Sequence, residues 1–239
     1  RELYELVTTY VSKTYNKALR NRKKNMCLIF LLIIMQRMVT SSTAAIRQSL
    51  ERRLEVLKSQ SAKIGSLTEE DLIELDIEDG VDEALEAISL DIREEIGELE
   101  HIIAVAKQAE FQHLDVKVEK LVDTVDEIIS EDEEQKIIIF TEFVATQQET
   151  QKRLGAKGYS VSILNGSMNI DERNEALRVF RERANIFIST DAGGEGLNLQ
   201  FSNIIINYDL PWNPMKIEQR CGRADRIGQK RDVHIYNFI

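Results

Sequence analysis

Three arginines stand three residues apart near the end of this 239-residue chain, in the stretch QRCGRADRIGQ. They are Arg220, Arg223 and Arg226, and Gln219 precedes them. A guanidinium group stays charged and donates several hydrogen bonds in a planar fork, so it suits a phosphate group. Such arginines can stabilise the charge that develops during phosphoryl transfer. The alternative is a solvated basic helix face.

The flanking residues predict the helix that positions these arginines. Asn213 is a good N-cap residue, Pro214 suits a first helical turn, and Gly228 is a suitable stop. At about 100° per residue, an apolar stripe that can dock on a sheet consists of Ile217, Cys221 and Ala224. The opposite side carries Gln219, Arg223 and Arg226. Arg220 falls off that line, which predicts a supporting role for it.

Five short runs rich in β-formers recur from Lys136 onward: KIIIF, YSVSIL, NIFIST, NIIINY and VHIYNF. Several are apolar without alternation, which is typical of strands covered on both faces in a parallel sheet. Helical stretches such as DERNEALRVFRERA lie between some of them, so the pattern predicts a doubly wound α/β domain. Ligands bind such sheets beyond the carboxyl ends of the strands.

Small polar groups stand where the predicted strands end. These residues, which can contact a phosphate backbone, are Thr141, Asn165, Ser167 and Thr190. After NIFIST comes DAGGEGLNLQ, in which Gly193, Gly194 and Gly196 occupy three of four consecutive positions. Glycines allow backbone N–H groups to approach a phosphate or a ribose closely. An ordinary tight turn is the alternative for this segment.

The chain divides into three predicted segments: a helical region over 1–65, an acidic helical segment over 66–131, and an α/β lobe over 132–239. Residues 66–135 hold 25 acidic and 4 basic side chains, a net charge of −21, so the rest carries +11. The basic part suits a polyanionic partner. The acidic run suits either a solvated helix surface or a protein partner. Two amphipathic stripes are expected, one formed by Ala45, Ile46, Leu50, Leu54 and Leu57, the other by Leu114, Val118, Leu121, Val125 and Ile128.

Composition excludes several classes of protein. Cys27 and Cys221 are far apart, with no metal-binding spacing, so reduced thiols and no metal site are expected. The apolar run MCLIFLLIIM is about half the length that spans a bilayer, so a buried helix is expected rather than a membrane anchor. No signal-peptide layout is present, and a cytoplasmic or nucleoid-associated protein is expected, or a nuclear one in a eukaryote.

The motifs together resemble a known family. The stretches KIIIFTEF, LNGSMNIDERNEALRVF, ISTDAGGEGLNLQ, NYDLPWNP and EQRCGRADRIGQKR resemble the second RecA-like lobe of Swi/Snf-type ATPases in helicase superfamily 2. QRCGRADR fits the superfamily pattern Q-x-x-G-R-x-x-R, and the following IGQ favours the Swi/Snf branch. SSTAAIRQSLERRLE resembles the helical region between the lobes of bacterial members. The resemblance implies a RecA-like, P-loop-NTPase-type parallel sheet without its own P-loop, preceded by helices.

The resemblance also implies residue roles. Arg223 and Arg226 would be arginine fingers, and Gln219 would help to sense the nucleotide. The residues near the nucleotide would be Gly194, Glu195, Gly196 and Asn198. Asn198 departs from the ribose-binding Asp of many members. The DNA-phosphate contacts would be Thr141, Asn165, Gly166, Ser167 and Thr190. Trp212 would lie near the duplex, although a lone Trp can equally serve packing.

No G-x-x-x-x-G-K-[ST] motif occurs in the 239 residues, so the Mg-ATP cradle is missing from them. The resemblance therefore implies that ATP and Mg²⁺ are held mainly by an N-terminal RecA-like lobe, expected upstream of Arg1, and that this chain alone is inactive. The implied whole is an ATP-dependent double-stranded-DNA translocase that remodels protein–DNA complexes. Alternatives are a strand-separating superfamily 2 helicase and a non-catalytic DNA- or protein-binding module.

Overall fold

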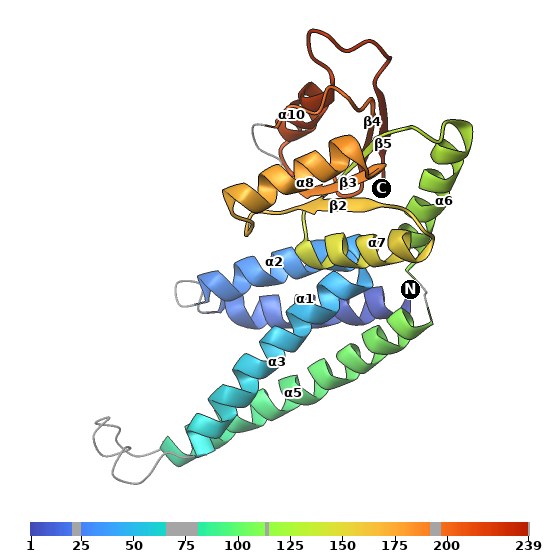
Figure 1. Cartoon of the computed structure of the whole chain (residues 1–239). Coiled ribbons are helices and arrows are strands. Elements are labelled where there is room, and N and C mark those ends of the chain that lie inside the picture. Colours follow the sequence, from blue (N-terminus) through green and yellow to red (C-terminus); the bar gives the residue numbers. More distant parts are fainter. Residues whose placement is uncertain (21–24, 66–80, 113–114, 192–196, 239) are drawn as a thin grey trace. The chain divides into compact units, whose positions relative to one another are not determined.

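The computed structural model describes residues 1–20, 25–65, 81–112, 115–191 and 197–238. Backbone contacts divide the chain into two compact units, Arg1–Leu114 and Asp115–Ile239. The first unit is helical in its described part, whereas the second contains a parallel sheet (Figure 1). A helical region followed by an α/β lobe is the order that the sequence predicts.

The first unit is built from α1 (Glu2–Leu19), α2 (Met26–Ser41), α3 (Thr43–Gly65) and α5 (Val81–Phe111). Helices α3 and α5 lie side by side along much of their length (Figure 1). The stripe predicted on α3 lies in the core: Ala45, Ile46, Leu50 and Leu57 are buried, and Leu54 packs half-buried against them. Side chains of α1, α2 and α5 complete this core, among them Val7, Tyr10, Leu32, Met35, Leu99 and Ile102.

Acidic side chains of α5 pair with basic side chains of α1 and α3. The nitrogen–oxygen distances are 2.7–3.2 Å for Lys13–Glu98, Lys17–Asp91, Arg47–Glu110, Arg53–Glu95 and Lys58–Glu100. Pairs at or near the surface each contribute little, but several along one pair of helices favour one alignment of the helices. Acidic residues of α5 therefore have partners within the first unit.

The apolar run that begins at Met26 forms the first ten residues of α2. Ile29, Leu32 and Met35 are buried, whereas Met26 and Phe30 are exposed. The run is thus a helix with one buried face rather than a fully buried one. Among the described residues, no helix combines the length and hydropathy of a membrane span.

The sheet of the second unit has five strands, and all of them are parallel. They are β1 (Ile137–Thr141), β2 (Val161–Leu164), β3 (Ile186–Thr190), β4 (Ile204–Asn207) and β5 (His234–Asn237), in the spatial order β2-β3-β1-β4-β5. Each of the five runs noted in the sequence forms one strand. The predicted doubly wound α/β lobe is therefore confirmed.

Helices cover both faces of this sheet. Successive strand residues point to opposite faces, so Ile137 and Ile139 face α6 (Val116–Glu131) and α7 (Val144–Ala156). Ile138 and Phe140 face α8 (Ile170–Glu182) and α10 (Met215–Ala224). Figure 1 shows α7 and α8 on opposite sides of the sheet. Burial on both faces explains why the strands read as apolar runs without alternation.

Helix α6 belongs to the second unit. Four residues of its predicted stripe are buried in the apolar cluster between the sheet and helices α6 and α7, namely Val118, Leu121, Val125 and Ile128. Leu114, the fifth, lies outside the described residues. Since α5 packs in the first unit, the predicted 66–131 segment is divided between the two units.

Two valines on α6 provide a matched pair that tests this packing. Val118 is 1% exposed and Val116 is 79% exposed. We expect Val118→Ala to lower the free energy of unfolding by about 1–3 kcal/mol, because two buried methyl groups and their contacts are lost. Val116→Ala should change it by less than about 0.5 kcal/mol. Urea unfolding followed by circular dichroism measures both, and equal effects would contradict the docking of α6.

Candidate functional site

The carboxyl ends of β1 and β4 lie where the direction of the strand connections reverses. The chain leaves β1 toward β2 and leaves β4 toward β5, on the opposite side. This reversal is the topological switch point, where open parallel sheets bind ligands. Thr141 ends β1, and Asn207 ends β4.

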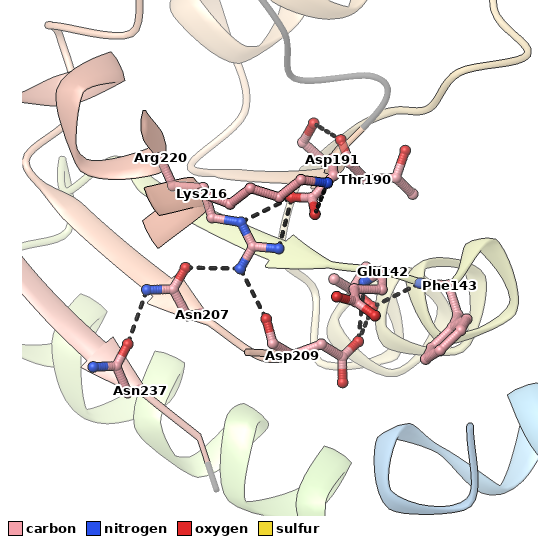
Figure 2. Close-up of polar contacts among 11 residues, drawn as sticks. Glu142, Phe143, Thr190, Asp191, Asn207, Asp209, Lys216, Arg220 and Asn237 are labelled. Carbon is pink, nitrogen blue, oxygen red and sulfur yellow. Dashed lines mark hydrogen bonds and ion pairs between the residues drawn. The ribbon is translucent and has the colours of Figure 1, made fainter. Parts of the chain in front are cut away.

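Arg220 lies buried at this edge, 2% exposed, in the centre of a polar network (Figure 2). Its Nε and Nη2 donate to Oδ1 of Asp191 at 2.9 and 2.6 Å. Its Nη1 donates to Oδ1 of Asn207 at 3.0 Å and to the carbonyl oxygen of Asp209 at 2.8 Å. The guanidinium carbon lies 5.1 Å from the centre of the Phe140 ring. The charge is therefore both paired and hydrogen-bonded, which burial of an ion requires.

These contacts fasten α10 to the sheet. Asp191 follows β3, and Asn207 extends the network to β5 by donating to Oδ1 of Asn237 at 2.9 Å (Figure 2). The predicted docking stripe of α10 therefore needs correction. Arg220 and Ala224 are its buried residues, while Ile217 and Cys221 are only half-buried. A charged side chain takes the central docking position because the strand ends supply its partners.

The ends of α10 also differ from the prediction. The helix begins at Met215, whose amide donates to Oδ1 of Asn213 at 3.0 Å, and it ends at Ala224. The predicted stop at Gly228 is wrong, because Gly228 lies in a later turn with φ of +107°. Arg226 is consequently not helical. Its Nε donates to the carbonyl oxygen of Gly222 at 2.7 Å, which holds it against the last turn of the helix.

Gln229 shapes the loop that carries Arg226. Its Nε2 donates to the carbonyl oxygens of Gln200 and Ser202 at 3.0 Å and to that of Ala224 at 3.2 Å. These bonds draw the chain back onto the turn at 200–202 and give a physical reason for the early end of α10. In the sequence, the IGQ stretch indicates only a family resemblance, and nothing in it predicts this structural role of Gln229.

The remaining residues of the arginine motif stay accessible. Gln219 is exposed and Arg223 is half-buried, and a separation of four places them on one face of α10. Arg226 is exposed. Asn198 is also exposed, and its Oδ1 accepts a hydrogen bond from the Gln200 amide at 3.3 Å. The other predicted nucleotide residues, Gly194, Glu195 and Gly196, lie outside the described residues.

The predicted DNA-contact residues fall into two groups. Thr141, Asn165 and Thr190 are buried at the strand ends. The Thr141 hydroxyl donates to Oδ2 of Asp209 at 2.6 Å. Asn165 Oδ1 accepts from the Ser167 hydroxyl at 2.7 Å. By contrast Gly166 and Ser167 are exposed, as is Trp212 at 72%. The residues of the first group therefore hold the strand ends together by hydrogen bonds, and the residues of the second group lie on the surface of this edge.

Sequence reasoning missed four polar residues of this edge: Asn207, Asp191, Asp209 and Gln147. The first three stand at or just after a strand end, so the rule that selected Thr141 could have found them. Gln147 is a buried residue of α7. Its Nε2 donates to the carbonyl oxygens of Leu164 and Ile188, at 2.8 Å each, and so joins β2 to β3. Its position within a helical stretch carries no such signal.

Two other features carry no chemistry at this edge. Burial raises the pKa of the Cys221 thiol, which disfavours the nucleophilic thiolate. In the described part of the chain, no cluster of three or more His, Cys, Asp or Glu side chains could hold a metal ion. A cavity of about 350 Å³ lies at the other, amino-terminal edge of the sheet, and the residues that line it include Lys136, Asn203 and Arg231.

The fold and the site together define a class of domain: a RecA-like lobe with a Q-x-x-G-R-x-x-R motif beside the carboxyl edge of its sheet. Residues 117–228 match the family described as the helicase conserved C-terminal domain. The chain is 52% identical over 103 residues to an uncharacterized ATP-dependent helicase, YqhH, of Bacillus subtilis. The aligned part is 43% of this chain and 18% of that protein. It is 37% identical over 106 residues to the RNA polymerase-associated protein RapA of Vibrio cholerae, covering 43% and 11%.

The fold has a counterpart among solved structures. The C-terminal part of the Fun30 ATPase domain aligns over 100% of this chain and 80% of its own, with a TM-score of 0.55 and 20% identity. The family match and the curated relatives confirm the recognition of a superfamily 2, Swi/Snf-type C-terminal lobe, and the solved structure shows the fold alone. The chain spans less than a fifth of the length of the two curated relatives described above.

Two cations that share Asp191 test the anchoring role of Arg220. We expect Arg220→Met to lower the free energy of unfolding by at least about 2 kcal/mol, because oxygens of Asn207 and Asp209 lose a buried donor and Asp191 keeps only its second cation. Lys216 pairs with Asp191 at 3.4 Å but is about half exposed. Lys216→Met should therefore cost less than about 1 kcal/mol. Urea unfolding gives both values, and equal small losses would contradict the anchoring role.

Proposed function

We propose that this chain supplies the second motor lobe of an ATP-dependent double-stranded-DNA translocase that remodels protein–DNA complexes. The observation that carries the proposal is the division of labour within one motif. Arg220 is buried and holds α10 to the strand ends, whereas Gln219, Arg223 and Arg226 remain accessible beside it. Arg223 lies on the anchored helix, and Arg226 is held against its last turn by the bond to the Gly222 carbonyl. Both guanidinium groups would therefore lose little freedom on meeting a phosphate, which suits groups that act in a transition state.

The chemistry of these side chains fits a nucleoside triphosphate. Arg223 and Arg226 would contact the γ-phosphate, and Gln219 would contact the nucleotide beside them. ATP with Mg²⁺, held mainly by a lobe that has a P-loop, supplies the phosphoryl group and a metal that neutralises its charge. This chain contributes positive charge at the phosphate oxygens when the two lobes close. By itself the 239-residue chain is expected to hydrolyse ATP negligibly.

The exposed residues beyond β2 and β4 suit a phosphate backbone rather than base edges. Gly166 and Ser167 are small and exposed, so a phosphate could approach the backbone here, where the Ser167 hydroxyl would exchange its bond to Asn165 for one to a phosphate oxygen. Backbone and hydroxyl contacts of this kind carry no sequence information. Trp212, exposed beside α10, would couple contact with the duplex to the arginine motif. Repeated closure of the two lobes would then move the duplex backbone past this edge. Translocation along DNA is thus proposed, without base-specific recognition.

Substituting either accessible arginine tests the catalytic part of the proposal. In the complete protein that joins this chain to an ATP-binding lobe, Arg223→Ala and Arg226→Ala should each lower kcat by about 10³-fold or more, because transition-state charge loses its partner. KM for ATP should change little. Steady-state ATPase assays with saturating duplex DNA measure both.

The matched control for this pair is Arg183→Ala, which removes an exposed arginine just beyond α8. It should leave kcat within about twofold of the unsubstituted protein, since a surface charge away from the motif has no role in the transition state. A rise in KM without loss of kcat in the Arg223 or Arg226 variant would assign these residues to ground-state binding and overturn the proposal.

Two exposed serines flanking β2 test the phosphate contact. Ser167 follows the carboxyl end of β2, and Ser160 precedes its amino end. We expect Ser167→Glu to weaken duplex binding about tenfold, because a carboxylate would face a phosphate, and Ser160→Glu to leave it unchanged. Fluorescence anisotropy of a labelled duplex at fixed salt gives the Kd of each variant. Equal affinities would exclude this edge as the DNA contact.

A further inference from the structure

Asp209 occupies a junction between three elements at the switch point of the sheet. It is buried, and it follows β4 by two residues. Oδ2 of its carboxylate accepts the Thr141 hydroxyl at 2.6 Å and the Glu142 amide at 3.1 Å, which fixes the turn between β1 and α7 (Figure 2). Its carbonyl oxygen accepts Nη1 of Arg220 at 2.8 Å, which ties it to α10.

The other carboxylate oxygen of Asp209 faces α6. Nζ of Lys117 lies 3.5 Å from Oδ1, and it also lies 4.6 Å from the centre of the Tyr208 ring. Lys117 is 21% exposed and sits in the first turn of α6, just after the N-cap residue Asp115. A partly buried ammonium held by both a carboxylate and an aromatic face has two reasons to stay in place. The start of the second unit is thereby joined to the end of β4.

We propose that Asp209 is a positioning residue that couples α6 to the arginine motif. Its carboxylate receives Lys117, and its backbone holds Arg220, so α6 and α10 share one rigid connection. Movement of the chain entering α6 would then reach Arg223 and Arg226 through a single buried residue. The coupling is a property of this chain alone, whereas its effect on turnover rests on the proposed function.

Hydrogen exchange in the 239-residue chain tests the coupling without any activity. We expect Lys117→Met to speed amide exchange within 217–224 of α10 by about threefold to tenfold, because the position of Asp209 loses one of its constraints. Lys117→Arg keeps the charge and should restore most of the protection. A Lys117→Met protein whose α10 exchanges at the original rate would overturn the proposal.

A second lysine provides the matched control. Nζ of Lys157 pairs with Asp126 of α6 at 3.1 Å, so Lys157→Met also removes an ion pair of α6 but touches neither Asp209 nor α10. Exchange within 217–224 should be unchanged in that variant. Equal acceleration in the Lys117→Met and Lys157→Met proteins would show general loosening of α6, and it would refute a specific connection through Asp209.

ATPase kinetics of the complete protein separate failure of this inference from failure of the proposed function. Asp209→Asn keeps an acceptor for Thr141 but removes the charge, and both it and Lys117→Met should lower kcat about threefold to tenfold with little change in KM. Lys117→Arg should recover most of kcat. Loss of activity in the Arg223 and Arg226 variants, with full kcat in the Lys117 and Asp209 variants, would refute the coupling and leave the function intact.

Discussion

The ion pair between Arg220 and Asp191 is the constraint on which the candidate site depends. A guanidinium group that is almost fully buried is tolerable only when its charge and its N–H groups all have partners, and three residues at the ends of β3 and β4 provide them. Those partners exist because parallel strands bring their carboxyl ends to one edge. The same contacts fix how α10 lies on the sheet. The position of Arg223 therefore follows from where buried Arg220 is held, whereas that of Arg226 also depends on the loop that Gln229 holds.

Around this pair the sheet supplies the rigidity. Strands with apolar side chains on both faces require helices on both sides, and α6 and α7 cover one face while α8 and α10 cover the other. Small polar residues collect at the carboxyl edge because apolar layers occupy the strand interiors. Gln147 and Thr141 are buried and form hydrogen bonds to other residues at this edge, whereas Gly166 and Trp212 are exposed on it. Such an edge suits the phosphate contact proposed above, and the arginine motif adds positive charge.

Much of this fold could be predicted because its signals are local. All five strands can be recognised in the sequence as short runs of strand-forming residues, and the apolar residues of α6 from Val118 to Ile128 follow helical spacing. The end of α10 could not be predicted, because Gln229 ends that helix through carbonyl groups some 30 residues earlier in the chain. Nor could the burial of Arg220, which depends on partners from separate strands. Ion pairs that join α5 to α1 and α3 likewise depend on tertiary pairing, so the acidic run read as a surface.

A double-mutant cycle on Arg220 and Asp191 tests the central claim most directly. The free energy of unfolding would be measured for Arg220→Met, for Asp191→Leu and for the double variant. An ion pair with one almost fully buried partner predicts that the double variant loses less than the two single losses combined, with a coupling of about 2 kcal/mol or more. Additive losses, with a coupling near zero, would contradict the claim that this pair holds the arginine motif in place.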